Sequence, residues 1–124
     1  MNHNEEVTKD HVQFVREGVT IRYPVEKVTY FESCGNYVLV HLMDGTKGSL
    51  RITLAKVQST YGNAVALIER RHLVFVRELL CVWRDVEGRY HATCRRCKTL
   101  PVGRTRFKEV RALFPRDGVG RRKT

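Results

Sequence analysis

Apolar and polar residues alternate along much of the first half of the chain. The alternation runs through residues 19–23 and 26–31, and again through 36–43 and 47–52, where an Asp-Gly turn separates the last two runs. Because successive side chains in a strand point to opposite faces of a sheet, this alternation is typical of strands. The pattern therefore predicts two strands followed by a β-hairpin, with Gly45 able to take the positive φ that a tight reversal needs.

Two short polar stretches interrupt the apolar runs. The first, "ESCGN", covers residues 32–36, and the second, "ERRH", covers residues 69–72. Apolar, strand-like residues lie on both sides of each stretch, so we expect each to be a loop at the end of a strand. Binding residues are found disproportionately on loops that a rigid scaffold holds in place. The two stretches are therefore the first candidates for a functional surface.

Two other stretches change to the helical period. In residues 53–61 the apolar residues share one face, Thr53 can cap the start and Gly62 is placed to end the helix. In residues 104–114 an apolar stripe lies opposite a basic stripe, and Pro115 stops the helix. The sequence therefore predicts two short amphipathic helices.

The remaining apolar runs extend the predicted β structure toward the C-terminus. Residues 79–94 read as a hairpin that turns at Glu87 and Gly88, and residues 98–102 as a last strand. Pro101 indicates that this strand is an edge or ends there, because proline cannot donate to a sheet. The pattern gives about seven to ten short strands and two short helices, which is a mainly β fold.

A chain of 124 residues has room for one domain with a modest core. We expect a flexible N-terminus over residues 1–11, the domain over 12–115, and a basic flexible tail over 116–124. No apolar run is long enough to span a membrane, and the N-terminus is polar rather than signal-like. The expected location is therefore cytoplasmic, without membrane insertion.

The charge of the chain is strongly basic, with a formal net charge of +10. Residues 94–124 carry eleven Lys and Arg against two acids, so this segment supplies nearly all of the excess. An excess of this size, clustered in one part of the chain, is typical of a protein that binds a polyanion such as nucleic acid. A solvated face with a basic tail is the alternative interpretation.

The cysteines form one CxxC motif, "CRRC", at Cys94 and Cys97. A structural zinc site needs four ligands, and no second CxxC or HxxxH pair completes the set. The motif lies between two strand-like runs, so we expect the two cysteines to face each other across a hairpin. A zinc-linked interaction module at this pair stays open as an alternative, although no metal site is predicted.

No pattern in the sequence indicates catalysis. The five histidines lie far apart and without metal-ligand spacing: His3, His11, His41, His72 and His91. No nucleophile has a partner at a fixed spacing, so neither an enzyme nor a cofactor is predicted. Binding of RNA, or of nucleic acid without sequence preference, is a second alternative. Most aromatic residues fall on apolar phases, however, which does not favour the exposed stacking platforms that such proteins use.

Four blocks of the sequence resemble the LytTR family of bacterial DNA-binding domains in order and spacing. The match covers about residues 15–114, and its four blocks are "KVTYFESCGNYVLVHLMDG", "TLAKVQSTYG", "LIERRHLV" and "LPVGRTRFKEVRALF". The resemblance implies an elongated fold of about ten short strands with small helices. It also implies a transcription regulator whose loops enter successive major grooves, commonly at paired direct repeats.

The resemblance also implies which side chains contact DNA. The base-reading residue of the first loop matches Asn36, that of the middle loop matches Arg70, and that after the last strand matches Arg104. These residue types suit the task, because Asn can pair with adenine and Arg with guanine through two hydrogen bonds each. Secondary or phosphate contacts are expected from the polar and basic neighbours of these loops, which are Glu69, Arg71, His72, Arg106, Lys108 and Arg111.

The chain departs from the family pattern in the middle block. Glu69 stands where the family has His, Arg71 where it has a small hydroxyl residue, and His72 where it has an aromatic. Gly103 likewise replaces the usual Ser before Arg104. We expect Glu69 to position an arginine by an ion pair or to accept a hydrogen bond from a cytosine amino group. The expected partner is double-stranded DNA carrying promoter direct repeats, with a homodimer on DNA and a regulatory protein partner left open.

Overall fold

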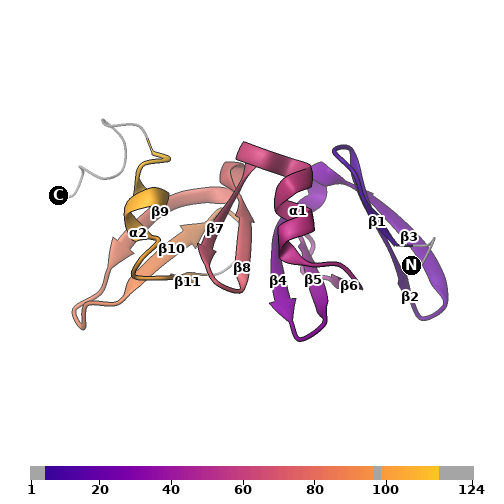
Figure 1. The fold of residues 1–124 in the computed structure, drawn as a ribbon, viewed down its shortest axis with the longest axis horizontal. Helices are drawn as coiled ribbons and strands as arrows, with labels where there is room; N and C mark the ends of the chain where they lie inside the picture. Colours follow the sequence, from indigo (N-terminus) through magenta and orange to yellow (C-terminus); the bar gives the residue numbers. More distant parts are fainter. Residues whose placement is uncertain (1–4, 97–98, 115–124) are drawn as a thin grey trace.

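The computed structural model describes residues 5–96 and 99–114, which form three antiparallel sheets placed in a row (Figure 1). The strands are β1 (Glu6–Val7), β2 (His11–Arg16), β3 (Val19–Pro24), β4 (Val28–Cys34), β5 (Tyr37–Leu42), β6 (Lys47–Leu50), β7 (Val65–Glu69), β8 (His72–Phe75), β9 (Leu79–Arg84), β10 (Tyr90–Cys94) and β11 (Leu100–Val102). The helices are α1 (Leu54–Tyr61) and α2 (Phe107–Arg111), with 3-10 turns η1 (Val25–Lys27), η2 (Gly62–Ala64) and η3 (Val76–Glu78). The predicted mainly β fold with two short helices is confirmed.

The central sheet has five strands in the order β6-β5-β4-β8-β7. In Figure 1, the smaller sheet β1-β2-β3 lies to the right of the central sheet, and the sheet β11-β10-β9 lies to its left. We call these two the N-terminal and the C-terminal sheet. Neighbouring strands are antiparallel throughout, as expected for strands joined by short turns. The described chain is therefore elongated, and the hairpin turns of the three sheets follow one another along its lower edge in Figure 1.

The central sheet is covered on both faces, and this gives the molecule two cores. Phe31 of β4 packs into a cluster with the N-terminal sheet and α1, whereas its neighbour Tyr30 packs into a cluster with the C-terminal sheet and α2. Residues 28–31 are consequently all buried, at 0–3 % exposure. Burial on both faces fixes β4, since a slip of one residue would exchange the two sets of side chains.

Gly48 of β6 marks the contact between the N-terminal and central sheets. A Cβ atom at this position would lie 2.3 Å from Cε1 of Phe14, and Phe14 is itself completely buried. No side chain fits there unless the ring moves, and close packing leaves it nowhere to go. A residue without a side chain is therefore required where β2 crosses β6.

The local sequence sets both ends of α1. Thr53 caps α1 by accepting a hydrogen bond from the backbone N–H of Lys56 at 3.1 Å, and Gly62 ends the helix with a φ of +56°. The second helix is shorter than the predicted 104–114, because the N–H of Arg106 donates to the carbonyl of Gly103 and forms a turn before it. Pro115 lies outside the described residues.

The N-terminal segment contains structure within its described part. Glu6 and Val7 form β1, which pairs with the start of β2, and the ring of His11 contacts the Glu6 carboxylate at 2.7 Å. The backbone N–H of Arg51 donates to Glu5 at 2.9 Å, which ties this segment to the end of β6. Among the described residues, no helix is long and apolar enough to cross a membrane.

Candidate nucleic-acid interface

The first polar stretch, residues 32–36, ends in the turn between β4 and β5, and its first three residues continue β4 instead of forming the expected loop. Cys34 and Tyr37 are paired across the hairpin, so Gly35 and Asn36 make a two-residue reversal at its tip. Gly35 has a φ of +65°, a conformation that glycine adopts at no steric cost. Asn36 is exposed at the tip, with the strands behind it held by the core. The interruption of the apolar run thus presents one amide side chain to solvent.

The second polar stretch is the turn between β7 and β8. Arg70 and Arg71 are both exposed at its tip. The Glu69 carboxylate accepts a hydrogen bond from the backbone N–H of Arg71 at 2.9 Å and contacts the ring Nδ1 of His72 at 2.7 Å. Asp and Asn side chains stabilise tight turns by accepting from the backbone N–H two residues on, and the longer Glu69 side chain makes the same kind of contact here. The two arginines are therefore carried on a turn of defined shape.

These two turns lie side by side at the same end of the central sheet, because β4 pairs directly with β8. Glu32 is the cross-strand partner of His72. Beyond this pair, the backbone N–H of Ser33 donates to the carbonyl of Arg71 at 2.8 Å, and Nε of Arg71 donates to the carbonyl of Ser33 at 3.2 Å. Both tips point to the lower edge of the molecule in Figure 1.

The residues after β11 reach the same edge by a separate contact. The backbone N–H of Gly103 donates to the carbonyl of Ile68 at 2.7 Å, next to the second turn. A Cβ at Gly103 would lie 3.7 Å from that carbonyl oxygen and 3.8 Å from the Cα of Glu69. Arg104 follows directly and is exposed. The segments that carry Asn36, Arg70 and Arg104 are thus linked by backbone hydrogen bonds into one continuous edge, and base contact by these residues stays a prediction.

Helix α2, which follows Arg104 along the chain, carries further basic residues. Lys108 and Arg111 are exposed, and Nη1 of Arg106 lies 3.7 Å from the Glu109 carboxylate. The opposite side of the helix buries Val110 and stacks Phe107 on Tyr90 at 4.1 Å between ring centroids. The predicted division into an apolar and a basic side therefore holds within α2, but Leu113, which the apolar period also placed on the buried side, is 44% exposed. The phosphate contacts stay a prediction.

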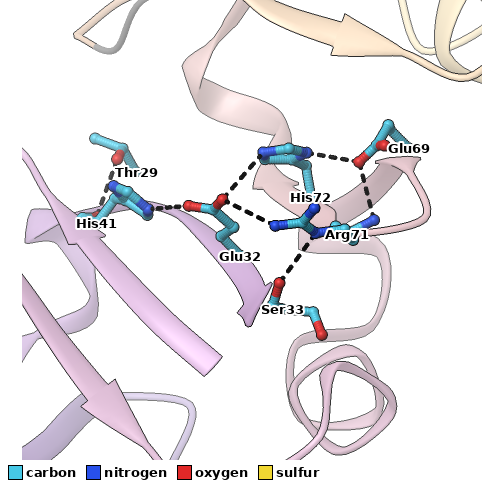
Figure 2. A network of polar contacts seen from close by, with 7 residues as sticks. All are labelled: Thr29, Glu32, Ser33, His41, Glu69, Arg71 and His72. Carbon is cyan, nitrogen blue, oxygen red and sulfur yellow. Dashed lines mark hydrogen bonds and ion pairs between the residues drawn. The ribbon is translucent and has the colours of Figure 1, made fainter. Parts of the chain in front are cut away.

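A network of polar side chains lies directly behind the two turns (Figure 2). The Glu32 carboxylate contacts Nε2 of His41 at 2.9 Å, Nη2 of Arg71 at 3.7 Å and Nε2 of His72 at 3.9 Å. The ion pair that we expected Glu69 to make with an arginine is made by Glu32 instead, while Glu69 holds Arg71 through its backbone. Sequence reasoning placed Glu32 in a candidate stretch but did not predict its contact with His41, because that contact depends on strand register.

The surroundings of Glu69 lower the pKa of its carboxyl group. Partial burial raises the pKa, but hydrogen bonds from His72 and from the backbone N–H of Arg71, together with the charges of both residues, outweigh it. The net result is a pKa below the ordinary value for glutamate. Glu69 is therefore ionised at neutral pH and does not offer a proton to a phosphate or base.

Two of the described cysteines, Cys34 and Cys81, are free thiols. Cys34 and Cys81 are half-buried, and Cys94, at the end of β10, is buried. Cys97, the other half of the CRRC motif, lies outside the described residues, as do Lys98 and the basic tail 116–124. Within residues 5–96 and 99–114, no group of three His, Cys, Asp or Glu side chains could hold a metal ion.

Comparison with known proteins identifies the family. The sequence model described as the LytTr DNA-binding domain matches residues 18–115. Among solved structures, a LytTr DNA-binding domain from Bacillus cereus is similar, with a TM-score of 0.73 and 18% sequence identity. The similarity covers 85% of this chain and 96% of that one, and at this identity it shows the fold alone. No curated protein matches the chain.

Proposed function

The chain belongs to the LytTR family of DNA-binding domains, and from this premise we propose that it is a transcription regulator that reads specific duplex sequences with its turns. Asn36, Arg70 and Arg104 read bases in the major groove. Amide and guanidinium groups at exposed turns can approach the base edges there, where each base pair presents a distinct pattern of donors and acceptors. The family is one of DNA-binding domains rather than of enzymes, and no reaction is assigned to the chain.

One observation carries the proposal: three segments far apart in sequence meet at one edge through backbone hydrogen bonds of 2.8 and 2.7 Å. A rigid edge that presents three reading side chains in a fixed order suits a regular target such as a groove of DNA. Flexible loops would lose more conformational entropy on binding and would discriminate less well. The hairpin turns follow the long axis of the molecule (Figure 1), and the proposal includes their entry into successive major grooves along one face of a duplex.

The remaining polar residues serve affinity more than sequence choice. Arg106, Lys108 and Arg111 contact phosphates, and their charge makes binding depend on salt. Arg71 and His72 support the middle turn, and Glu69 shapes it. The target comprises direct repeats at promoters in the cytoplasm, on which two copies of the protein bind as a homodimer. Control of activity by a separate regulatory protein is part of this proposal.

Competition binding tests the proposed function against its alternatives. A fluorescent duplex that carries a site enriched from a random duplex pool is bound by the full chain at moderate salt, and unlabelled competitors are then added. Duplex carrying the same site should displace the probe at far lower concentration than random duplex, single-stranded DNA or structured RNA. Equal displacement by all four competitors would contradict sequence reading and favour binding through charge alone.

A zinc chelator tests the remaining alternative. It should leave both binding and thermal stability unchanged, and a loss of either would favour the metal-linked module at Cys94 and Cys97.

A further inference from the structure

The network behind the turns points to a residue that matters for specificity without being exposed at the tips. We propose that Glu32 is a positioning residue, which holds the Asn36 turn and the Arg70 turn at a fixed separation so that they read DNA as one unit. The inference rests on the proposed function, because it concerns how that reading edge is held. In the same proposal, Arg71 is a clamp that links the two turns and is not a free phosphate contact.

The position of Glu32 makes one carboxylate the meeting point of three neighbouring strands. It stands on β4, two residues before the end of that strand at Cys34, and one of its oxygens contacts His41 on β5 at 2.9 Å. The other oxygen lies 3.7 Å from Arg71 in the second turn and 3.9 Å from His72 on β8. Figure 2 shows these contacts radiating from the single carboxylate.

Arg71 is held from two directions. Its guanidinium donates from Nε to the carbonyl of Ser33 at 3.2 Å, while Nη2 approaches Glu32. Its own carbonyl accepts from the N–H of Ser33, and its own N–H donates to Glu69. Every one of these partners belongs to the first hairpin or to the second turn itself. The side chain therefore spans the space between the turns along the sheet edge.

Most side chains of the network are largely buried, so the interactions between their charges are only weakly screened by solvent. The side chains of Glu32, His41 and His72 are 22%, 13% and 14% exposed, whereas that of Arg71 is 53% exposed. Pairs of this kind are screened less than surface pairs, and a group left without its partner keeps its desolvation cost. His41 is held in turn by stacking on Tyr30 at 4.0 Å between ring centroids, so the carboxylate is anchored to the core.

Substitution of Glu32 separates positioning from general stability. Glu32→Gln keeps the size and a hydrogen-bond acceptor but removes the charge that holds Arg71. We expect affinity for the selected site to fall about tenfold, in keeping with the loss of a charge-assisted contact. Affinity for random duplex should stay the same or rise slightly, since a negative charge near phosphates has been removed. Glu26→Gln is the matched control, because Glu26 is an exposed glutamate of η1 and should change neither value.

A coupling measurement provides the readout that a purely structural role would not move. In the native background, Asn36→Ala and Arg70→Ala should lose specific affinity non-additively, because the two turns bind as a unit. In the Glu32→Gln background the two losses should become additive. An unchanged ratio of specific to random affinity in Glu32→Gln, or unchanged coupling, would overturn the proposal while leaving the proposed function intact. Absence of any selected site for the native protein would instead contradict the proposed function.

A second variant decides the matter if Glu32→Gln does not fold. Arg71→Lys keeps the positive charge at an exposed position but loses the planar geometry needed to reach both Ser33 and Glu32. If Arg71 is a clamp, this variant should lose specific affinity and keep its affinity for random duplex. If Arg71 is only a phosphate contact, lysine should serve equally well on both, and the proposal is wrong.

Discussion

Ser33 and Arg71 exchange two hydrogen bonds between the first hairpin and the second turn. The backbone N–H of Ser33 donates to the carbonyl of Arg71 at 2.8 Å, and the guanidinium Nε of Arg71 returns to the carbonyl of Ser33 at 3.2 Å. The backbone N–H and the backbone carbonyl of Ser33, beside the first turn, thus both form hydrogen bonds with Arg71 of the second turn. The two polar stretches that looked like separate loops in sequence therefore form one surface, whose parts keep their relative position.

Removal of one reading arginine should lower both affinity and selectivity. Arg70→Ala or Arg104→Ala is expected to weaken the cognate site by about 1–3 kcal/mol and to flatten base preference at one position. Titration by fluorescence anisotropy, on the cognate duplex and on each single-base variant of it, measures both effects. Arg22→Ala is the matched control, because Arg22 is an exposed arginine on β3 that bonds Gln13. Equal losses on cognate and random duplex would remove the tested arginine from base reading.

Lys108 should behave differently from the reading arginines. As an exposed residue of α2, it is expected to contact phosphate and carry no sequence information. Lys108→Ala should weaken all duplexes alike and reduce the slope of log affinity against log salt by about one unit. Affinities measured at four or more salt concentrations give the slope. A loss confined to the cognate site would show that Lys108 reads bases.

Gly48→Ala should destabilise the fold without touching the reading edge. The added methyl group would overlap the ring of the buried Phe14, so the N-terminal sheet must shift away from β6. Overpacking of this kind costs about 1–3 kcal/mol in the free energy of unfolding. Urea denaturation followed by circular dichroism measures the change, with the exposed neighbour Ser49→Ala as control. Native stability in Gly48→Ala would mean that the two sheets do not pack as described.

Acid should weaken the β9–β10 hairpin through Asp85. A hydrogen bond from His91, then one from the backbone N–H of Arg89, lowers the pKa of Asp85 from 3.8 to about 2. Because the folded-state pKa is the lower one, this stabilisation is fully present above about pH 4 and is lost as the pH falls toward 2. The free energy of unfolding should therefore fall less steeply over this range in Asp85→Asn than in the native chain. Identical slopes from urea titrations at several pH values would contradict this assignment.

Local signals in the sequence predicted the elements well. Thr53 and Gly62 bound α1 as expected, since capping depends on residues a few positions apart. The polar stretches 32–36 and 69–72 were expected to be loops, but only Gly35 and Asn36, and Arg70 and Arg71, form turns. The other residues of both stretches continue the strands, because cross-strand pairing extends to Cys34 and to His72. The resemblance to the LytTR family then supplied the arrangement of those turns, which periodicity alone does not contain.

Contacts between distant segments could not be read from the pattern. That Thr29 and Tyr30 are both buried depends on sheets packing against both faces of β4. The meeting of Glu32 with His41 and His72 depends on strand register, and the same holds for the close approach of Gly48 to Phe14. The second helix is shorter than its apolar period suggested, because residues 103–106 form a turn where the first residues of the helix were predicted.

Selection from a random duplex pool tests the central claim most directly. The full chain is incubated with the pool at moderate salt, and the bound fraction is recovered and sequenced over several rounds. Sequence reading by three turns predicts enrichment of one short motif, repeated at a spacing of about one helical turn, or roughly 10 base pairs. The enriched motif should weaken in the Arg70→Ala and Arg104→Ala variants at different positions. Tight binding without enrichment of any motif would contradict the account and assign the affinity to charge alone.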